Sequence, residues 1–185
     1  LVGGQPPHHG EVVLSLKRLD RLREIDTQTN IMICEAGMAL ALAQQHASDA
    51  GRLFPLSLGS EGSCTIGGNL STNAGGTAAL AYGLARDMAS GLEVVLADGR
   101  VLNTLTKLKK DNTGYNLHNL FIGAEGTLGV ITAASLKLFA MPRTIETAFI
   151  GLASPDAALR LLARAQREAA TALTSFELMA EIAID

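Results

Sequence analysis

Short runs of apolar residues, bounded by polar and turn residues, recur along the first three quarters of the chain. Runs of this length that are rich in Val, Ile and Leu are typical of β-strands. Asp98 and Gly99 stand between two of them and predict a hairpin turn. The predicted strands in this part of the chain are residues 11–16, 23–26, 31–35, 92–96, 101–102 and 130–139.

Apolar residues three and four apart predict helices in the same region. Residues 39–50 carry such a pattern, and Gly51 follows where the residue after a helix is most often glycine. Leu117, Leu120 and Phe121 predict a short amphipathic helix. Leu19, Leu22 and Ile25, three apart, predict a helical turn before the second strand.

The chain changes character at residues 141–143, which we interpret as a domain boundary. Beyond it, residues 146–152 and 175–179 have strand patterns. Between them, Ser154 and Pro155 are typical of a helix N-terminus, and the 3–4 spacing continues to about Ala170. This order predicts a β-α-β unit, the opening half of a ferredoxin-like layer.

Composition narrows the function classes. The chain has 185 residues, 48% of them hydrophobic, with a net charge of −3 and 4% aromatics. No basic stripe and few aromatic residues are present, so we expect no nucleic-acid partner. Two cysteines are too few for a disulfide framework. The chain begins at Leu1 rather than Met and ends at Asp185 just after a strand pattern, so we expect a fragment of a longer protein.

The stretch of residues 62–77 carries no charge, two Gly-Gly pairs and many short polar side chains. Glycine lets a backbone approach another molecule closely, and successive N–H groups can bind a phosphate without Lys or Arg. A mobile linker is the alternative. Ile66 and Leu70, at the spacing of core residues, argue against it.

Several motifs in fixed order resemble the FAD-binding core of the vanillyl-alcohol-oxidase-type (PCMH-type) flavoproteins. They are residues 55–59, 66–69, 72–76, 82–83 and 92–99. Residues 110–115 and 120–129 look most like the D-lactate and D-2-hydroxyglutarate dehydrogenase branch.

The resemblance implies an α+β fold: the second half of a PCMH-type FAD-binding domain at residues 1–141, followed by the start of a ferredoxin-like cap domain at residues 142–185. FAD would lie between two α+β halves. Only the end of the glycine turn that grips its pyrophosphate would remain, at residues 1–4. We expect weak FAD binding and no turnover by this chain alone.

The resemblance also implies non-covalent FAD binding. The backbone of residues 67–76 would line the phosphate and ribityl part, with hydrogen bonds from Thr72 and Asn73. Tyr82 and Gly83 would lie near the flavin ring or its linker, and residues 126–132 would wrap the adenine and ribose. The implied cofactor-binding residues are Pro55, Gly59, Gly62, Ser63, Cys64, Ile66, Gly67, Gly68, Asn69, Thr72, Asn73, Gly75, Gly76, Tyr82, Gly83, Glu125, Gly126, Gly129, Val130 and Ile131.

Each of these roles has a simpler alternative. Thr72 and Asn73 could cap local turns, and Tyr82 could be an ordinary core residue. Glu125 could face solvent, and Cys64 is better read as a small buried hydrophobe than as a reactive thiol. We assign no catalytic residue and no metal ligand: the family's catalytic base, its substrate-binding arginine and lysine, and its histidines for a divalent metal lie further along the chain.

The resemblance implies oxidation of a D-2-hydroxy acid to the 2-oxo acid by hydride transfer to flavin. The partners would be the small 2-hydroxy acid and an electron acceptor, either a protein or a quinone, and a homodimer is left open. We expect a cytoplasmic protein, or one peripheral to the inner membrane. The alternatives are another flavin-dependent oxidase on the same scaffold, such as an alkyl-ether-lipid or sugar-alcohol oxidase, and a non-catalytic FAD-binding subunit.

Overall fold

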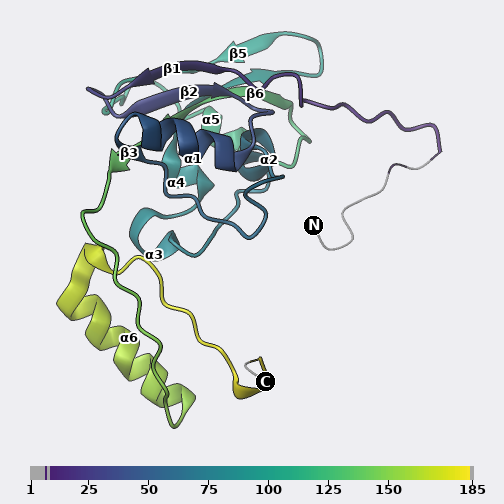
Figure 1. Cartoon of the computed structure of the whole chain (residues 1–185). Coiled ribbons are helices and arrows are strands. Elements are labelled where there is room, and N and C mark those ends of the chain that lie inside the picture. The colour runs from purple at the N-terminus through teal and green to yellow at the C-terminus, as the bar shows by residue number, and fades with distance from the viewer. Residues whose placement is uncertain (1–6, 8, 184–185) are drawn as a thin grey trace.

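An antiparallel sheet of five strands, in the order β1-β2-β6-β4-β5, forms the centre of the chain (Figure 1). The structure, a computed structural model, describes residue 7 and residues 9–183; the predicted glycine turn at residues 1–4 lies outside them. The strands of this sheet are β1 (Leu22–Asp26), β2 (Ile31–Glu35), β4 (Ala89–Val95), β5 (Val101–Asn103) and β6 (Val130–Lys137). A two-stranded sheet pairs β3 (Arg52–Leu53) with β7 (Phe139–Ala140).

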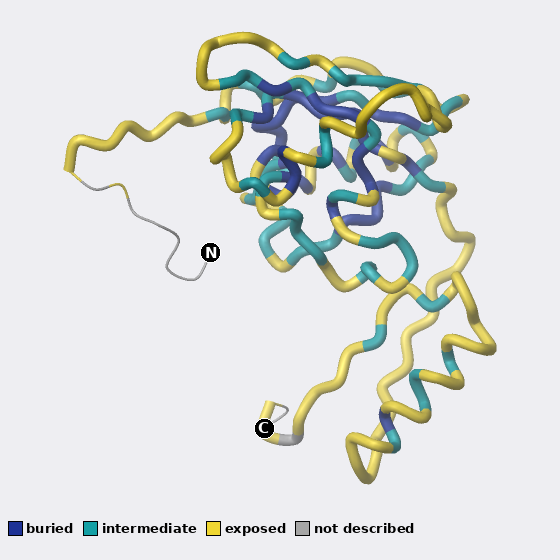
Figure 2. Tube along the Cα trace, turned by 180° about the vertical axis from the view of Figure 1, so that it is seen from behind, coloured by how far each residue is buried: buried dark blue, intermediate teal, exposed yellow. Residues whose placement is uncertain are grey.

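Helices cover one face of the sheet (Figure 1). They are α1 (Leu40–Asp49), α2 (Ile66–Ser71), α4 (Ala85–Met88) and α5 (His118–Phe121), with α3 (Ala79–Tyr82) further from the strands. Buried residues concentrate between these helices and the sheet, as Figure 2 shows. The fold is therefore a mixed α+β structure with its core on one side of an antiparallel sheet.

Alternation along β2 separates the two faces of the sheet. Met32 and Cys34 are fully buried in the core with the helices. Burial also raises the pKa of the Cys34 thiol to about 12, so this thiol stays protonated and unreactive at neutral pH. Glu35 stands next to Cys34 in sequence, and its side chain therefore points to the opposite face of the sheet.

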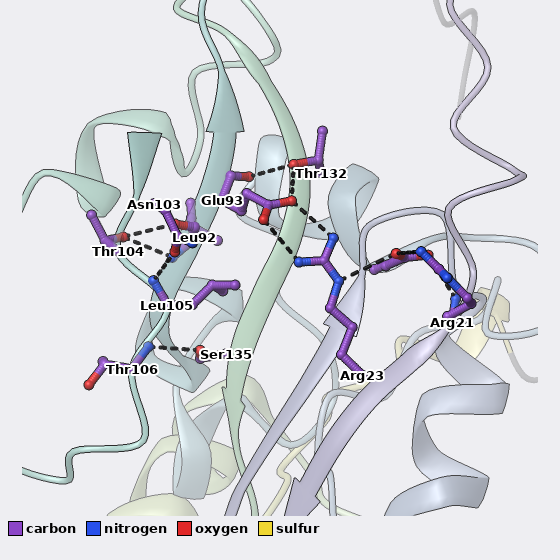
Figure 3. Close-up of polar contacts among 11 residues, drawn as sticks. Arg21, Arg23, Leu92, Glu93, Asn103, Thr104, Leu105, Thr106, Thr132 and Ser135 are labelled. Atoms are coloured by element: carbon purple, nitrogen blue, oxygen red, sulfur yellow. Dashed lines mark hydrogen bonds and ion pairs between the residues drawn. The ribbon is translucent and has the colours of Figure 1, made fainter. Parts of the chain in front are cut away.

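A chain of charged and polar contacts crosses that opposite face (Figure 3). Glu35 is fully buried and accepts hydrogen bonds from the guanidinium groups of Arg21, at 3.0 and 3.3 Å, and of Arg23, at 3.3 Å. Arg23 also forms a two-bonded pair with Glu93 at 2.9 and 3.0 Å, and Glu93 accepts from the Thr132 hydroxyl at 2.8 Å. The network thus links strands β1, β2, β4 and β6.

Most of the predicted elements in this region are confirmed. Strands form at residues 22–26, 31–35, 89–95, 101–103 and 130–137, and helices form at residues 40–49 and 118–121. Gly51 has a φ of +68°, as expected after a helix, and Gly99 has a φ of +84° in the β4–β5 turn. Two predictions are wrong. Residues 11–16 are extended without a strand partner, and the helical turn at Leu19–Ile25 is replaced by β1.

The C-terminal part forms a helix but not the predicted β-α-β unit. Helix α6 (Pro155–Ala169) begins as expected, with the Ser154 hydroxyl accepting from the amide of Ala157 at 3.2 Å. Short 3₁₀ turns follow at η1 (Ala170–Ala172) and η2 (Glu181–Ala183). Residues 146–152 and 175–179 contain no strand, because no described segment pairs with their backbones. The strands predicted there are therefore wrong for this chain.

Replacing Ser154 with alanine is expected to destabilise α6 by about 1 kcal/mol, because the first turn loses its side-chain cap. Hydrogen exchange measured at the amides of residues 157–161 should become faster. Ser60→Ala serves as the control, because the Ser60 side chain does not cap α6. This variant should leave hydrogen exchange in α6 unchanged. Unchanged exchange in the Ser154 variant would show that this cap does not stabilise the helix.

Candidate functional site

The glycine-rich stretch begins as a helix rather than as an open loop. Thr65 caps α2, its hydroxyl accepting from the amide of Gly68 at 3.3 Å. Gly67 packs against Ala36, where an added Cβ would come within 2.7 Å of the Ala36 Cβ. Two glycines in so short a helix cost roughly 1 kcal/mol each in propensity. The helix therefore depends on its cap and on the close packing that Gly67 permits.

The backbone N–H groups at the start of α2 have partners within the protein. The amide of Ile66 donates to Met38 O at 2.9 Å, and that of Gly67 to Ala36 O at 2.7 Å. An anion nest formed by these amides is thus excluded in this conformation. The amides of Gly75 and Gly76 donate to no acceptor among the described residues, so they can donate to a ligand.

The Gly75-Gly76 segment is held against residues 57–61. Gly76 has a φ of +135°, and a Cβ there would lie 2.4 Å from Ser57 O. The Ser57 hydroxyl and the Leu58 amide donate to the Glu61 carboxylate at 2.8 and 3.1 Å, which lowers the pKa of Glu61. These contacts fix two glycine-containing segments, 59–62 and 75–76, in place.

The second glycine turn, residues 123–129, docks onto the C-terminus of α2. Gly123 N donates to Leu70 O and Glu125 N to Ser71 O, both at 3.0 Å. These bonds satisfy carbonyls that the helix leaves open at its end. Glu125 has a φ of +50° and Gly126 a φ of +79°, a left-handed pair that reverses the chain. The two glycine-rich motifs, whose contacting residues stand more than fifty positions apart in sequence, therefore form one continuous surface.

A cavity of about 370 Å³ opens beside this second turn. Its floor is the end of β4 with the start of β6, and its outer wall is the N-terminal segment that carries Leu14 and Leu16. The side chains around it include no charged residue. The lining residues are Leu14, Leu16, Val95, Leu96, Ala97, Gly126, Thr127, Leu128, Gly129, Val130 and Thr132.

The side chains predicted to contact a cofactor have local partners in this structure. The Thr72 hydroxyl donates to Gly68 O at 3.0 Å, and Asn73 accepts from the Arg86 amide at 3.0 Å while adopting a φ of +50°. Tyr82 packs edge-on against Phe139, with ring centroids 4.8 Å apart. These contacts match the simpler alternatives for the three residues. Their contact with a cofactor stays a prediction.

The remaining predicted residues divide by exposure. Buried ones shape the backbone and offer no side-chain contact at the surface: Pro55, Ile66, Gly67, Asn69 and Ile131. Exposed ones can meet a ligand directly: Gly59, Gly62, Ser63, Gly68, Gly76, Glu125 and Gly126. Cys64, Gly75, Gly83, Gly129 and Val130 are half-buried, and Cys64 accepts a long contact from Asn69 at 3.5 Å.

Sequence reasoning missed Arg86, which bonds to both the first glycine-rich motif, at Asn73, and the second motif, at Ile122. Its guanidinium donates to the carbonyls of Asn119 and Ile122, and its own amide donates to Asn73. The signal was present, because Arg86 is the one basic residue between Gly62 and Arg100. A guanidinium group needs hydrogen-bond acceptors, and main-chain carbonyls supply them here.

These features fit an FAD molecule. Free amides at Gly75 and Gly76 and left-handed glycines at the second turn suit an anionic pyrophosphate approached by bare main chain. The uncharged, largely aliphatic cavity suits a flat apolar ring such as adenine. Among the described residues, no three His, Cys, Asp or Glu side chains lie together in a way that could hold a metal ion.

Relatives in the curated collections of proteins carry the names that these motifs led us to expect. The D-2-hydroxyglutarate dehydrogenase of Bos taurus is 44% identical over 97% of this chain and 33% of its own length. That of Danio rerio is 49% identical over 83% of this chain, and the D-2-hydroxyglutarate–pyruvate transhydrogenase of Saccharomyces cerevisiae is 41% identical over 97%. The chain spans about a third of the length of these relatives.

Solved structures of an alkyldihydroxyacetonephosphate synthase share the fold. One aligns with a TM-score of 0.60 at 26% identity, covering 69% of this chain and 22% of its own. A second structure of the same enzyme, in another crystal form, gives 0.61 over 70% of this chain.

The cytoplasmic location expected from the sequence is wrong when judged by the relatives. The proteins of Bos taurus, Danio rerio and Rattus norvegicus are all named as mitochondrial. Within the described part of the chain, no helix is both long enough and apolar enough to cross a membrane.

A family model described as "FAD binding domain" matches residues 1–105, which is more than half of the chain. Together with the relatives, which are D-2-hydroxyglutarate and D-lactate dehydrogenases, this match confirms the resemblance seen in the motifs. The chain therefore belongs to the family of FAD-linked oxidoreductases that this FAD binding domain defines.

Proposed function

We propose that this chain supplies part of the FAD site of an enzyme that oxidises a D-2-hydroxy acid, of the D-2-hydroxyglutarate or D-lactate type, to its 2-oxo acid. The observation that carries the proposal is the docking of the second glycine turn onto α2 through Gly123 and Glu125. It joins the general FAD motif of residues 66–76 to the motif of residues 120–129 that marks the D-2-hydroxy-acid branch. The named relatives support the same substrate class.

In this proposal each segment has a separate task. The amides of Gly75 and Gly76 donate to the phosphate or ribityl oxygens, and the cavity beside Gly126–Gly129 receives the adenine and ribose. Leu14 and Leu16 cover that cavity and keep water from the ring. Non-covalently bound FAD would accept the hydride from the substrate's α-carbon.

Binding the phosphates through uncharged main-chain amides, with no lysine or arginine, affects the chemistry of the flavin. A lysine beside the flavin would stabilise its reduced, anionic form, whereas amide dipoles bind the phosphates and leave the ring's electronic tuning to other residues. In this proposal, the catalytic base and the metal ligands lie in other parts of the enzyme. The electron acceptor is a separate partner, either a protein or a quinone. We expect this chain alone to bind FAD weakly and to have no turnover.

The decisive experiment is anaerobic titration of the holoprotein, expressed from its complete reading frame, with candidate acids. We expect the visible absorbance of the oxidised flavin to bleach with D-2-hydroxyglutarate or D-lactate and to persist with the L forms. Bleaching by an alkyl-ether-lipid or sugar-alcohol substrate instead would assign another oxidase on the same scaffold. A flavin that no D-2-hydroxy acid reduces would refute the proposed substrate class.

A further inference from the structure

A second cavity, of about 800 Å³, has Arg86 in its lining and shares no lining residue with the first. It is formed by α4, the start of β4, the end of β6 and the loop between β5 and α5. Its lining is mainly polar, with hydroxyl, amide and charged side chains. Nothing in the proposed flavin chemistry uses this cavity.

Three cations line the cavity, and none of them is neutralised by a carboxylate among the described residues. Arg86 donates to main-chain carbonyls of Asn119 and Ile122. Lys137 donates to the main-chain carbonyl of Asp87 at 2.6 Å. Lys109 forms no described ion pair. Carbonyl oxygens orient these groups but do not cancel their charge.

The two carboxylates in the lining, those of Asp87 and Asp111, form no described ion pair with these three cations, but they keep their negative charge. The Asp87 carboxylate accepts from the Leu84 amide at 2.8 Å, and the Asp111 carboxylate from the Thr113 amide at 3.1 Å. His118 stands half-buried beside the cations, and burial, followed by the charges of Lys137 and Arg86, lowers its pKa. The imidazole is therefore neutral at pH 7 and can donate one N–H without adding charge.

We propose that this cavity is a binding site for a small oxyanion, a carboxylate or a phosphate, held by Lys137, Lys109 and the N–H groups of His118 and Asn119. The three cations outnumber the two carboxylates of the lining by one, and an anion there would balance that excess positive charge. Ser90 and Tyr115 add hydroxyl groups at the same wall.

Arg86 connects this site to the second glycine turn, residues 123–129. An added Cβ at Gly123 would lie 3.4 Å from Arg86 Nη2 and 3.5 Å from the Asn73 Cβ. The same guanidinium thus borders the oxyanion cavity and the docked turn. An anion that draws on Arg86 would compete with its bonds to the carbonyls of Asn119 and Ile122.

The test titrates the 185-residue chain, without FAD, with inorganic phosphate and separately with succinate, at constant ionic strength. Binding is followed through the ring resonances of His118 and by calorimetry. We expect saturable binding of at least one of the two, and a loss of affinity of roughly tenfold in Lys137→Met, since one charge-assisted hydrogen bond is removed. Phosphate alone, succinate alone or both would assign the site to phosphates, to carboxylates or to oxyanions in general.

Lys107→Met is the matched control. Lys107 stands between the lining residues Thr106 and Leu108 but is not itself in the lining. It pairs with Glu24 at 2.6 Å and Asp26 at 3.4 Å, so its removal should leave anion affinity unchanged. Lys109→Met is a second test variant. Lys109 is exposed, so its replacement should lower anion affinity without affecting folding. Linear, non-saturating shifts of His118 with both anions, or equal affinity in the wild type and all three variants, would overturn the proposal. Because FAD is absent from the assay, failure here is distinct from failure of the proposed function.

Discussion

Glu35→Ala is expected to lower the free energy of unfolding by about 3 kcal/mol at pH 7. The wild-type carboxylate is fully buried and accepts four hydrogen bonds, three from the guanidinium groups of Arg21 and Arg23 and one from the Arg21 amide at 3.1 Å. Hydrogen bonds to a charged group contribute about 1.5–3 kcal/mol each, and truncation also leaves a cavity. Urea unfolding of the two proteins measures the difference directly.

The pH dependence of that difference tests its electrostatic origin. Hydrogen bonds from Arg21, and its charge, hold the pKa of Glu35 below the usual value. The stabilisation is therefore present above the unfolded-state pKa of about 4.3 and is lost as the pH falls through the lower, folded-state pKa. The gap between wild type and variant should narrow below about pH 4. A gap that stays constant from pH 7 to pH 3 would attribute the loss to packing alone.

Glu24→Gln is the control for this experiment. Glu24 also pairs with a cation across the sheet, at 2.6 Å from Lys107, but the two side chains are 45% and 41% exposed to solvent. Exposed ion pairs contribute little because water and salt screen them. We expect no measurable change in unfolding for this variant.

Gly76→Ala is expected to weaken FAD binding by roughly ten- to hundredfold in the protein expressed from its complete reading frame. The φ of +135° is strained for any L residue, and the new Cβ would lie 2.4 Å from Ser57 O, a main-chain atom that cannot rotate away. Strain of about 1–3 kcal/mol would shift the Gly75-Gly76 amides out of position. Fluorescence quenching on FAD titration gives the dissociation constant.

Gly151→Ala provides the comparison for that measurement. A Cβ added at Gly151 would meet no atom within 4 Å, and Gly151 has no left-handed φ. The affinity of the Gly151→Ala protein for FAD should therefore match that of the wild type. If Gly76→Ala also binds FAD like the wild type while the chain remains folded, the Gly75-Gly76 segment is not part of the cofactor site.

The sequence predicted the elements whose signals are local. The β2 run of apolar residues, the Asp98-Gly99 turn and the Ser154-Pro155 start of α6 each carry their own physical cause, and each is confirmed. Residues 11–16 and 146–152 have equally apolar patterns, but a strand needs a partner backbone, which a single run cannot indicate.

The candidate site also shows that contacts between distant segments could not be predicted from the sequence. No helix was predicted at α2, because its two glycines have low helix propensity. The helix forms because Gly67 meets Ala36 from a distant segment and Thr65 caps the first turn. Arg86 and the docking of Gly123 and Glu125 onto α2 likewise depend on contacts between segments far apart in sequence. The cofactor class could be inferred from motifs, whereas the hydrogen bonds that assemble the motifs could not.

The position of β6 determines when this protein can fold during its synthesis. β6 is the last strand of the five along the chain, yet it lies between β2 and β4. The β1–β2 and β4–β5 hairpins can each form as they leave the ribosome, but they stay unconnected until residues 130–137 have emerged. A ribosome that stalls before that point would therefore expose two hairpins with open edges, a species prone to capture by chaperones or to aggregation.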